Sequence, residues 1–299
     1  MPQPTRPKPP DRPPTPAAFP ASAGAGPSPR RERPRHGLVS TSPVTLLLAF
    51  AGLYLLAVWT PLGQAAENAL VRGYADDARI LALTESWGLP PFTNEEATLL
   101  AGAALIVVVA ALRRRWREGC AALVTVVGTL AVTELLSRFV LGRPDLVHAP
   151  QSLIAPSFPS GHVAIAVALV LGCVLVAPAS VRPYVVAVGC LWIAVTAGGV
   201  QSLYWHRPSD VLGATLLACA CYGLAVRLLK MATVPAATRS RARLPLAVAA
   251  VGALLASSRE DAVARPLVFA AAALACAALV HVTVLPPSSV TRAPRAHRE

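Results

Sequence analysis

Residues 157–179 read "SFPSGHVAIAVALVLGCVLVAPA" and put Pro159, Ser160, Gly161 and His162 directly before a long apolar run. The apolar part, 161–180, contains no charged residue. Its length is about that of an α-helix crossing the hydrocarbon core of a bilayer. The stretch therefore predicts a membrane helix whose first turn carries polar groups at the membrane surface.

Further apolar segments flank this run on both sides. They cover about 43–60, 97–112, 119–141, 183–203, 209–229, 243–257 and 266–285. The segment 243–257 is short for a crossing, so a re-entrant segment is an alternative there. The 299 residues are 55% hydrophobic and only 14% charged, whereas a soluble domain carries more charge. We expect an all-α fold, a polytopic membrane helical bundle with a six-helix core and two additional C-terminal apolar segments.

The composition also divides the chain. Residues 1–40 are rich in Pro, Arg, Ser and Ala without a hydrophobic period, which predicts a disordered cytoplasmic tail. A six-helix membrane domain follows at 41–230, then a C-terminal membrane hairpin at 231–286 and a basic tail at 287–299. Between the first two spans we expect an amphipathic helix on the membrane surface. The six cysteines lie in or beside apolar segments, which favours small buried side chains over disulfides or a zinc site.

The net charge of +12 predicts membrane orientation rather than nucleic-acid binding, because Lys and Arg accumulate on the cytoplasmic side of membrane spans. With a cytoplasmic N-terminus and eight alternating spans, 20 of the 27 Lys and Arg residues fall inside. We therefore expect a cell-membrane protein with both termini cytoplasmic. Should 243–257 not cross, only the C-terminus changes side. Residues 138–162 and 203–210 then share the extracytoplasmic face, so His162 and His206 can converge.

The first polar patch on that face is the "PSGH" of residues 159–162. The first turn of a helix offers unpaired N–H groups and the positive end of the helix dipole, which suit a phosphate. Gly161 lets the backbone approach closely, Ser160 adds a hydroxyl, and His162 can give or take a proton. The alternative is a serine N-cap followed by an interfacial histidine.

The second patch, "YWHRPSD" at residues 204–210, places His206 four residues before Asp210. On a helix these two share a face. A carboxylate that binds one ring nitrogen leaves the other free as a nucleophile or base. The pattern is weak by itself, since an aspartate that caps a helix near an interfacial histidine is common.

The third patch, "ELLSRFVLGRPDL" at residues 134–146, holds Arg138 and Arg143. The planar guanidinium group suits phosphate recognition. Glu134 lies one turn before Arg138 inside a predicted span, where a carboxylate is a functional candidate. The alternative is that Glu134 and Arg138 form an i, i+4 ion pair.

At these residues the sequence resembles the type 2 phosphatidic acid phosphatase superfamily, which includes membrane lipid phosphatases and the soluble vanadium haloperoxidases. Its signature is K-x6-RP, PSGH and SR-x5-H-x3-D. "PSGH" matches fully at 159–162, and "HRPSD" at 206–210 matches the end of the third motif. The resemblance covers about 43–229, and the predicted spans exclude a soluble haloperoxidase.

The resemblance implies a role for each matched residue. His206 would attack phosphorus and form a phosphohistidine, Asp210 would orient it, and His162 would protonate the leaving oxygen and then activate water. Ser160 and the N–H of Gly161 would hold the phosphoryl oxygens. No metal or other cofactor is implied.

Two motif arginines are missing from their usual places. Arg138 takes the lysine position of the first motif, but Asp145 and Leu146 occupy the Arg-Pro positions, and Gly199 and Val200 occupy the Ser-Arg positions. Electrostatic stabilisation is a large term in catalysis. We therefore expect substitutes among the arginines near the site, which are Arg143, Arg138 and Arg207.

The favoured hypothesis is a metal-independent hydrolase of a lipid phosphate or diphosphate in the outer leaflet. Its partners would be that lipid and the membrane, with no nucleic acid. The alternative is a non-catalytic membrane protein that binds a lipid phosphate on the same fold. A transporter is less favoured, because no inverted repeat is evident.

Overall fold

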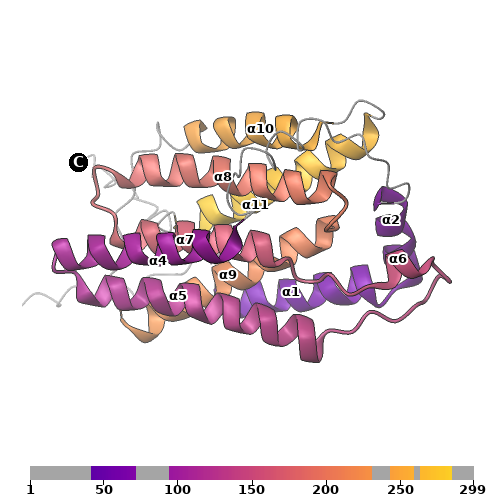
Figure 1. Ribbon diagram of the computed structural model, residues 1–299, viewed down its shortest axis with the longest axis horizontal. Helices are drawn as coiled ribbons and strands as arrows, with labels where there is room; N and C mark the ends of the chain where they lie inside the picture. Colours follow the sequence, from indigo (N-terminus) through magenta and orange to yellow (C-terminus); the bar gives the residue numbers. More distant parts are fainter. Residues whose placement is uncertain (1–41, 72–93, 231–242, 259–262, 285–299) are drawn as a thin grey trace, which may run out of the picture. The chain divides into compact units, whose positions relative to one another are not determined.

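The computed structural model describes residues 42–71, 94–230, 243–258 and 263–284, all within one compact unit, Gly37–Glu299 (Figure 1). In these ranges the regular structure is helical, with no β-strand. The elements are α1 (Pro43–Val58), α2 (Pro61–Val71), α4 (Glu95–Leu112), α5 (Trp116–Leu135), the π-helix η1 (Leu136–Val140), α6 (Gln151–Ile154), α7 (Gly161–Val176), α8 (Arg182–Ser202), α9 (Pro208–Leu228), α10 (Arg243–Ser257) and α11 (Ala264–Val284).

These helices confirm the expected all-α membrane bundle. Five are long and apolar enough to cross a bilayer: α4, α5 continued by η1, α8, α9 and α11. The pair α1 and α2 also passes that test together, but bends by 78° between the two helices. The helices α7 and α10 are apolar but have only 16 and 15 residues. The chain is therefore an integral membrane protein. The predicted tails at 1–40 and 287–299 fall outside the described residues.

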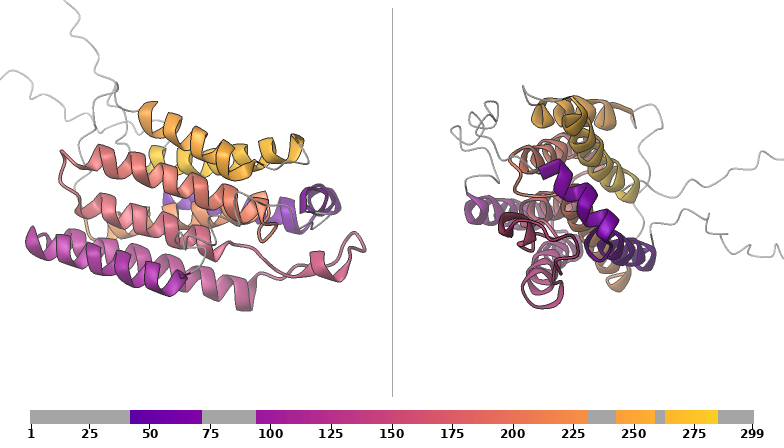
Figure 2. Two further views of the ribbon diagram at one scale, coloured as in Figure 1. Left: turned by 45° about the horizontal axis from the view of Figure 1, so that its top comes forward. Right: turned by 90° about the vertical axis from the view of Figure 1, so that its right-hand side faces the viewer.

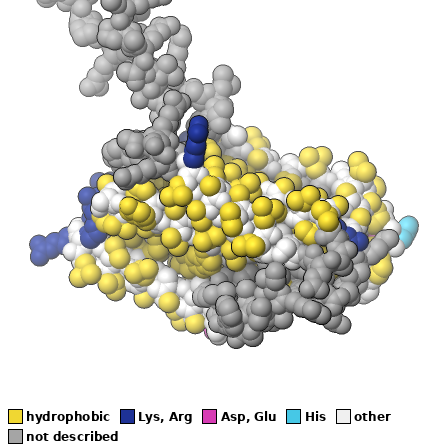
Figure 3. Space-filling model, turned by 90° about the horizontal axis from the view of Figure 1, so that it is seen from above, with side chains coloured by type: hydrophobic (Ala, Val, Ile, Leu, Met, Phe, Trp, Pro, Cys, Tyr) yellow, Lys and Arg dark blue, Asp and Glu magenta, His cyan; other side chains and the backbone are white. Residues whose placement is uncertain are grey.

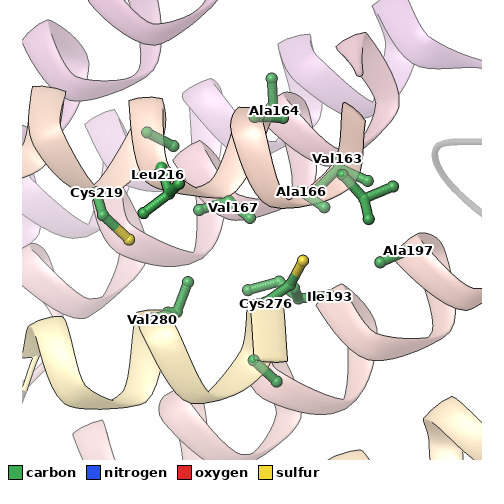
Figure 4. Packing of buried hydrophobic residues seen from close by; sticks show 14 of the residues in the cluster. Val163, Ala164, Ala166, Val167, Ile193, Ala197, Leu216, Cys219, Cys276 and Val280 are labelled. Carbon is green, nitrogen blue, oxygen red and sulfur yellow. The ribbon is translucent and has the colours of Figure 1, made fainter. Parts of the chain in front are cut away.

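The apolar run that follows "PSGH" forms α7, the centre of the bundle. The helix α7 packs against α4, α5, α8, α9 and α11, and almost all of its side chains are buried. Figure 4 shows one side of this packing, where α7 meets side chains of three neighbouring helices. The residues that it labels are Val163, Ala164, Ala166 and Val167 of α7, Ile193 and Ala197 of α8, Leu216 and Cys219 of α9, and Cys276 and Val280 of α11. A short helix without charge is thus enclosed on several sides.

The outer helices keep apolar surface facing outward. Leu100 and Leu105 of α4 are 69% and 54% exposed. Figure 3 shows hydrophobic side chains over most of the described surface of one face, with Lys and Arg side chains near its edges. Lipid tails are as apolar as these side chains, so such a surface is stable in a membrane.

The C-terminal pair of helices packs on the core. The helix α10 lies along α8, and α11 contacts α8, α9 and α10 (Figure 2). Gly252 allows the close approach of α10, since a Cβ there would lie 2.4 Å from Cδ1 of Leu191 in α8. The predicted division between 41–230 and 231–286 as domains remains a prediction.

Arginines cap the carboxyl ends of α7 and α9. Arg113 donates to the carbonyl oxygen of Val176 at 2.5 Å, and Arg117 to that of Leu229 at 2.6 Å. Arg182 donates to the carbonyl oxygens of Val174 and Ala177. The last carbonyl groups of a helix lack intrahelical partners and carry the negative end of its dipole, so guanidinium groups stabilise them.

Gly213 sets the distance between α9 and the segment before α7. A Cβ at this position would lie 2.5 Å from Cε2 and Cζ of Phe158. The Phe158 ring is only 4% exposed and packs 5.2 Å from the ring of Phe50 and 5.3 Å from that of Tyr54, centroid to centroid. The ring therefore has little room to move aside.

We expect Gly213→Ala to lower the free energy of unfolding by about 1–3 kcal/mol, the usual cost of overpacking a core. Gly128→Ala is the matched control, because a Cβ there meets nothing within 4 Å. Thermal unfolding in detergent micelles measures both. Equal stability of the two variants would contradict the assigned packing.

Candidate active site

The two motif histidines lie side by side, as their spacing predicts. His162 is in the first turn of α7 and His206 precedes α9, and their ring centroids are 5.9 Å apart. The helices α7 and α8 take the chain away and back between them. The backbone N–H of Ser160 donates to the carbonyl oxygen of Asp210 at 3.1 Å, which joins the two segments directly.

Asp210 is a buried carboxylate held by several groups. Its Oδ2 accepts hydrogen bonds from Oγ of Ser157 at 2.7 Å and from the N–H of Arg207 at 2.9 Å. The same oxygen lies 3.4 Å from Nδ1 of His206. Among the described residues Nδ1 of His206 makes no hydrogen bond, so this contact is an ion-pair distance rather than a formed hydrogen bond. Such contacts in unliganded sites commonly tighten when substrate binds.

Ser160 and Gly161 form the mouth of α7. Ser160 is fully buried, and its Oγ accepts a hydrogen bond from the N–H of Val163 at 3.4 Å. This is the N-cap that the sequence offers as an alternative, but it uses only the oxygen and leaves the hydroxyl proton to donate. A Cβ on Gly161 would meet nothing within 4 Å, so the space beside it is open.

Arg207 links the start of α9 to the segment before α7 by hydrogen bonds. Its side chain is buried, with one nitrogen donating to Oγ of Ser157 and another to the carbonyl oxygen of Leu153, both at 2.7 Å. Its Nε is buried without a hydrogen-bond partner among the described residues. Two arms of this guanidinium group are therefore occupied by the segment that precedes α7.

Arg143 lies in the loop between η1 and α6 and is half-buried. One guanidinium nitrogen donates to Oδ1 of Asn68 at 3.0 Å. Burial lowers the pKa of Arg143, and the neighbouring charge of Arg207 lowers it further, while Glu67 and Asp210 oppose the shift. The two arginines thus sit near each other and near the buried carboxylate beside His206.

Arg138 is exposed and pairs within its own helical segment. Its guanidinium group pairs with Glu134 one turn earlier, and the two side chains are 69% and 55% exposed. The i, i+4 alternative from the sequence is therefore confirmed. The contacts of the described residues do not join Arg138 to either histidine.

Glu95 is a neighbour of the site that sequence reasoning missed. Its Oε1 lies 2.9 Å from Nε2 of His162, and its side chain is 46% exposed. The ring of Trp205 lies 5.4 Å from the ring of His162. The only signal for Glu95 is its place in the first turn of a predicted span, which a carboxylate also occupies to stabilise the helix dipole.

The helix α2 supplies a second group of missed residues, Gln64, Glu67 and Asn68. They lie on one face at i, i+3 and i+4, and all three are buried, whereas Leu62 is 81% exposed. Oε1 and Oε2 of Glu67 accept from the N–H and Oγ of Ser209 at 3.0 and 2.9 Å. Burial, and then the charge of Asp210, raise the pKa of Glu67 to about 7. An amphipathic helix was expected near here, but the polar face of α2 turns toward the protein.

Comparisons with known proteins agree with the motifs. The family model described as PAP2 superfamily matches residues 118–233, which include α5, α7, α8 and α9 and both histidines. No curated protein matches the chain, and no solved structure matches it. Glu67 and Glu95 lie before the matched region, and α10 and α11 lie after it. Residues 118–233 therefore match the PAP2 superfamily, in agreement with the resemblance of the motifs to the type 2 phosphatidic acid phosphatases.

Proposed function

We propose that the protein is a metal-independent phosphatase that hydrolyses a lipid phosphate or diphosphate at the extracytoplasmic face of the cell membrane. The match of residues 118–233 to the PAP2 superfamily, whose members are phosphatases, supports a phosphoester hydrolase in general. The observation that carries the finer proposal is the pair of histidines 5.9 Å apart at the start of α7, one of them beside a buried aspartate.

The reaction proceeds in two displacements. Because Nδ1 of His206 faces Asp210, Nε2 attacks phosphorus and the bond from phosphorus to the lipid oxygen breaks. His162 gives its proton to that oxygen, and the lipid alcohol leaves. From a lipid diphosphate, the bond that breaks is the one to the bridging oxygen, and the lipid monophosphate leaves. His162 then takes a proton from water as the water oxygen attacks phosphorus. The bond to His206 breaks, inorganic phosphate leaves, and both histidines return to their starting states.

The open space beside Gly161 supports binding of the phosphoryl oxygens there. The N–H groups of the first turn of α7 and the hydroxyl of Ser160 are the donors. Arg143 is the proposed substitute for the missing arginines. Arg207 already holds Ser157 and Leu153, and Arg138 is paired with Glu134 on an exposed surface.

The proposed role of Glu95 is to stabilise the protonated form of His162 through the 2.9 Å contact. An opposite charge at such a distance favours the charged form of an imidazole. The 2.9 Å contact also fixes the orientation of the His162 ring.

A non-catalytic protein that binds a lipid phosphate remains the second candidate, and a specific observation favours it. Gly199 and Val200, at the positions of the Ser-Arg pair, are both buried in α8. No guanidinium group can therefore reach the substrate from that helix position. Saturable binding of a lipid phosphate without turnover would select this candidate.

We expect the purified protein to release phosphate from at least one member of a panel of lipid phosphates and diphosphates in excess chelator. His206→Ala should abolish release, because no other group replaces the nucleophile. His148→Asn is a control at an exposed position of the loop before α6, where asparagine tolerates the backbone φ of 52°. Loss of release on chelation, or full activity of His206→Ala, would overturn the proposal.

Arg143→Ala should lower kcat/KM by roughly 10²–10³-fold, the typical effect of removing one donor from a developing oxyanion. Arg138→Ala removes the same charge from the surface and should change kcat/KM less than about twofold, within the small energy of an exposed ion pair. Steady-state kinetics on the best substrate compare the two. Equal losses would refute the assignment of Arg143.

Glu95→Gln should lower kcat by about tenfold, less than the roughly 10²–10⁴-fold effect of the acid–base group itself, because Glu95 only supports His162, and should leave KM nearly unchanged. Glu96→Gln changes the neighbouring, exposed carboxylate and should be silent. A rise in KM with constant kcat in Glu95→Gln would instead indicate a role in substrate binding.

A further inference from the structure

The buried face of α2 connects two segments that come together at the candidate site. Nε2 of Gln64 donates to the carbonyl oxygen of Pro144 at 2.6 Å, and Oε1 of Gln64 accepts from the N–H of Leu146 at 3.2 Å. Asn68 accepts from Arg143. One turn of α2 thus holds the loop that carries Arg143 at three points.

Glu67 lies between these two residues on α2 and reaches the other segment. It binds both the backbone N–H and the hydroxyl of Ser209, 142 residues away in the sequence. Ser209 is the second residue of α9, so its N–H is one of the amides that the helix itself leaves unpaired. A carboxylate at this place also interacts favourably with the helix dipole. The bond therefore fixes the first turn of α9 from outside.

That first turn contains the groups proposed for the chemistry. Ser209 directly precedes Asp210 and follows His206 by three residues. The charges that face Glu67 are Asp210 and Arg207, both at the start of α9, and Arg143 from the loop. The two arginines repel each other, whereas the carboxylate of Glu67 attracts both. These attractions add to the two hydrogen bonds to Ser209, and it is the hydrogen bonds that fix the position of the first turn of α9.

We propose that Glu67 is a positioning residue: its carboxylate holds the first turn of α9, and with it His206 and Asp210, against the loop that carries Arg143. This inference rests on the proposed phosphatase reaction. Glu67 acts through Ser209 and need not touch the substrate. Its effect is on the alignment of the nucleophile, to which rates of displacement are sensitive.

Three substitutions separate position from charge. Glu67→Asp keeps the charge but withdraws the carboxylate by one methylene, and Glu67→Ala removes the carboxylate. Glu67→Gln removes the charge but keeps an oxygen that accepts from the Ser209 N–H and an amide group that donates to Oγ of Ser209. We expect kcat to fall about tenfold or more in the Asp and Ala variants, with KM changed less than about threefold. The Gln variant should recover to within about threefold of wild type. Leu62→Ala, on the exposed face of α2, is the control.

A second measurement does not depend on turnover. The ring ¹⁵N signals of His206 in detergent micelles, assigned by their loss in His206→Gln, report the environment of the nucleophile. They should move in Glu67→Asp and stay in place in Glu67→Gln. The inference would be overturned if Glu67→Asp kept the wild-type kcat and its His206 signals did not move. It would also be overturned if Glu67→Gln lost as much kcat as a correctly folded Glu67→Ala. If the wild type turns over no lipid phosphate, the proposed function fails while the His206 signals still decide the positioning role.

Discussion

The side chain and backbone of Asp210 are the point on which the candidate site depends. One carboxylate oxygen accepts from Ser157 and from the backbone of Arg207 and faces His206, while the carbonyl oxygen of the same residue accepts from Ser160. A fully buried carboxylate is costly unless such partners satisfy it. The segment before α7 and the first turn of α9 must therefore both be in place before this residue is stable.

Charge balance around Asp210 gives the site a second constraint. Arg143 and Arg207 would repel each other without nearby carboxylates, and Glu67 joins Asp210 in opposing that repulsion. The family's usual arginine positions on α8 are occupied by small or apolar residues. The cationic group proposed to replace them is Arg143, in the loop after η1, while Arg207, next to His206, is held by Ser157 and Leu153. The phosphate environment proposed here is thus assembled from different parts of the chain.

The sequence was sufficient to predict the helices, because the length of an apolar segment can be read locally. It also predicted that His162 and His206 meet, because two successive spans return the chain to the same face of the membrane. It was not sufficient to choose among the arginines. The spacing of Glu134 and Arg138 favoured an ion pair, which is confirmed, but only the fold separates Arg143 from Arg207. Glu67 and Glu95 could not be identified, because their partners lie 142 and 67 positions away. From the sequence alone, Glu67 fits an amphipathic helix on the membrane surface, and Glu95 fits a carboxylate that stabilises the dipole at the start of a helix.

The arginine caps at the carboxyl ends of α7 and α9 have an electrostatic consequence at the opposite end. Both helices begin at the candidate site, so their amino ends present positive potential to the same place. Arg113, Arg117 and Arg182 offset the negative ends, about 24 Å away for the 16 residues of α7. In a medium of low permittivity such a field is weakly screened. The net potential of α7 and α9 is therefore positive at the candidate site. The attraction of the site for an anion depends partly on the arginines at the opposite ends of these helices.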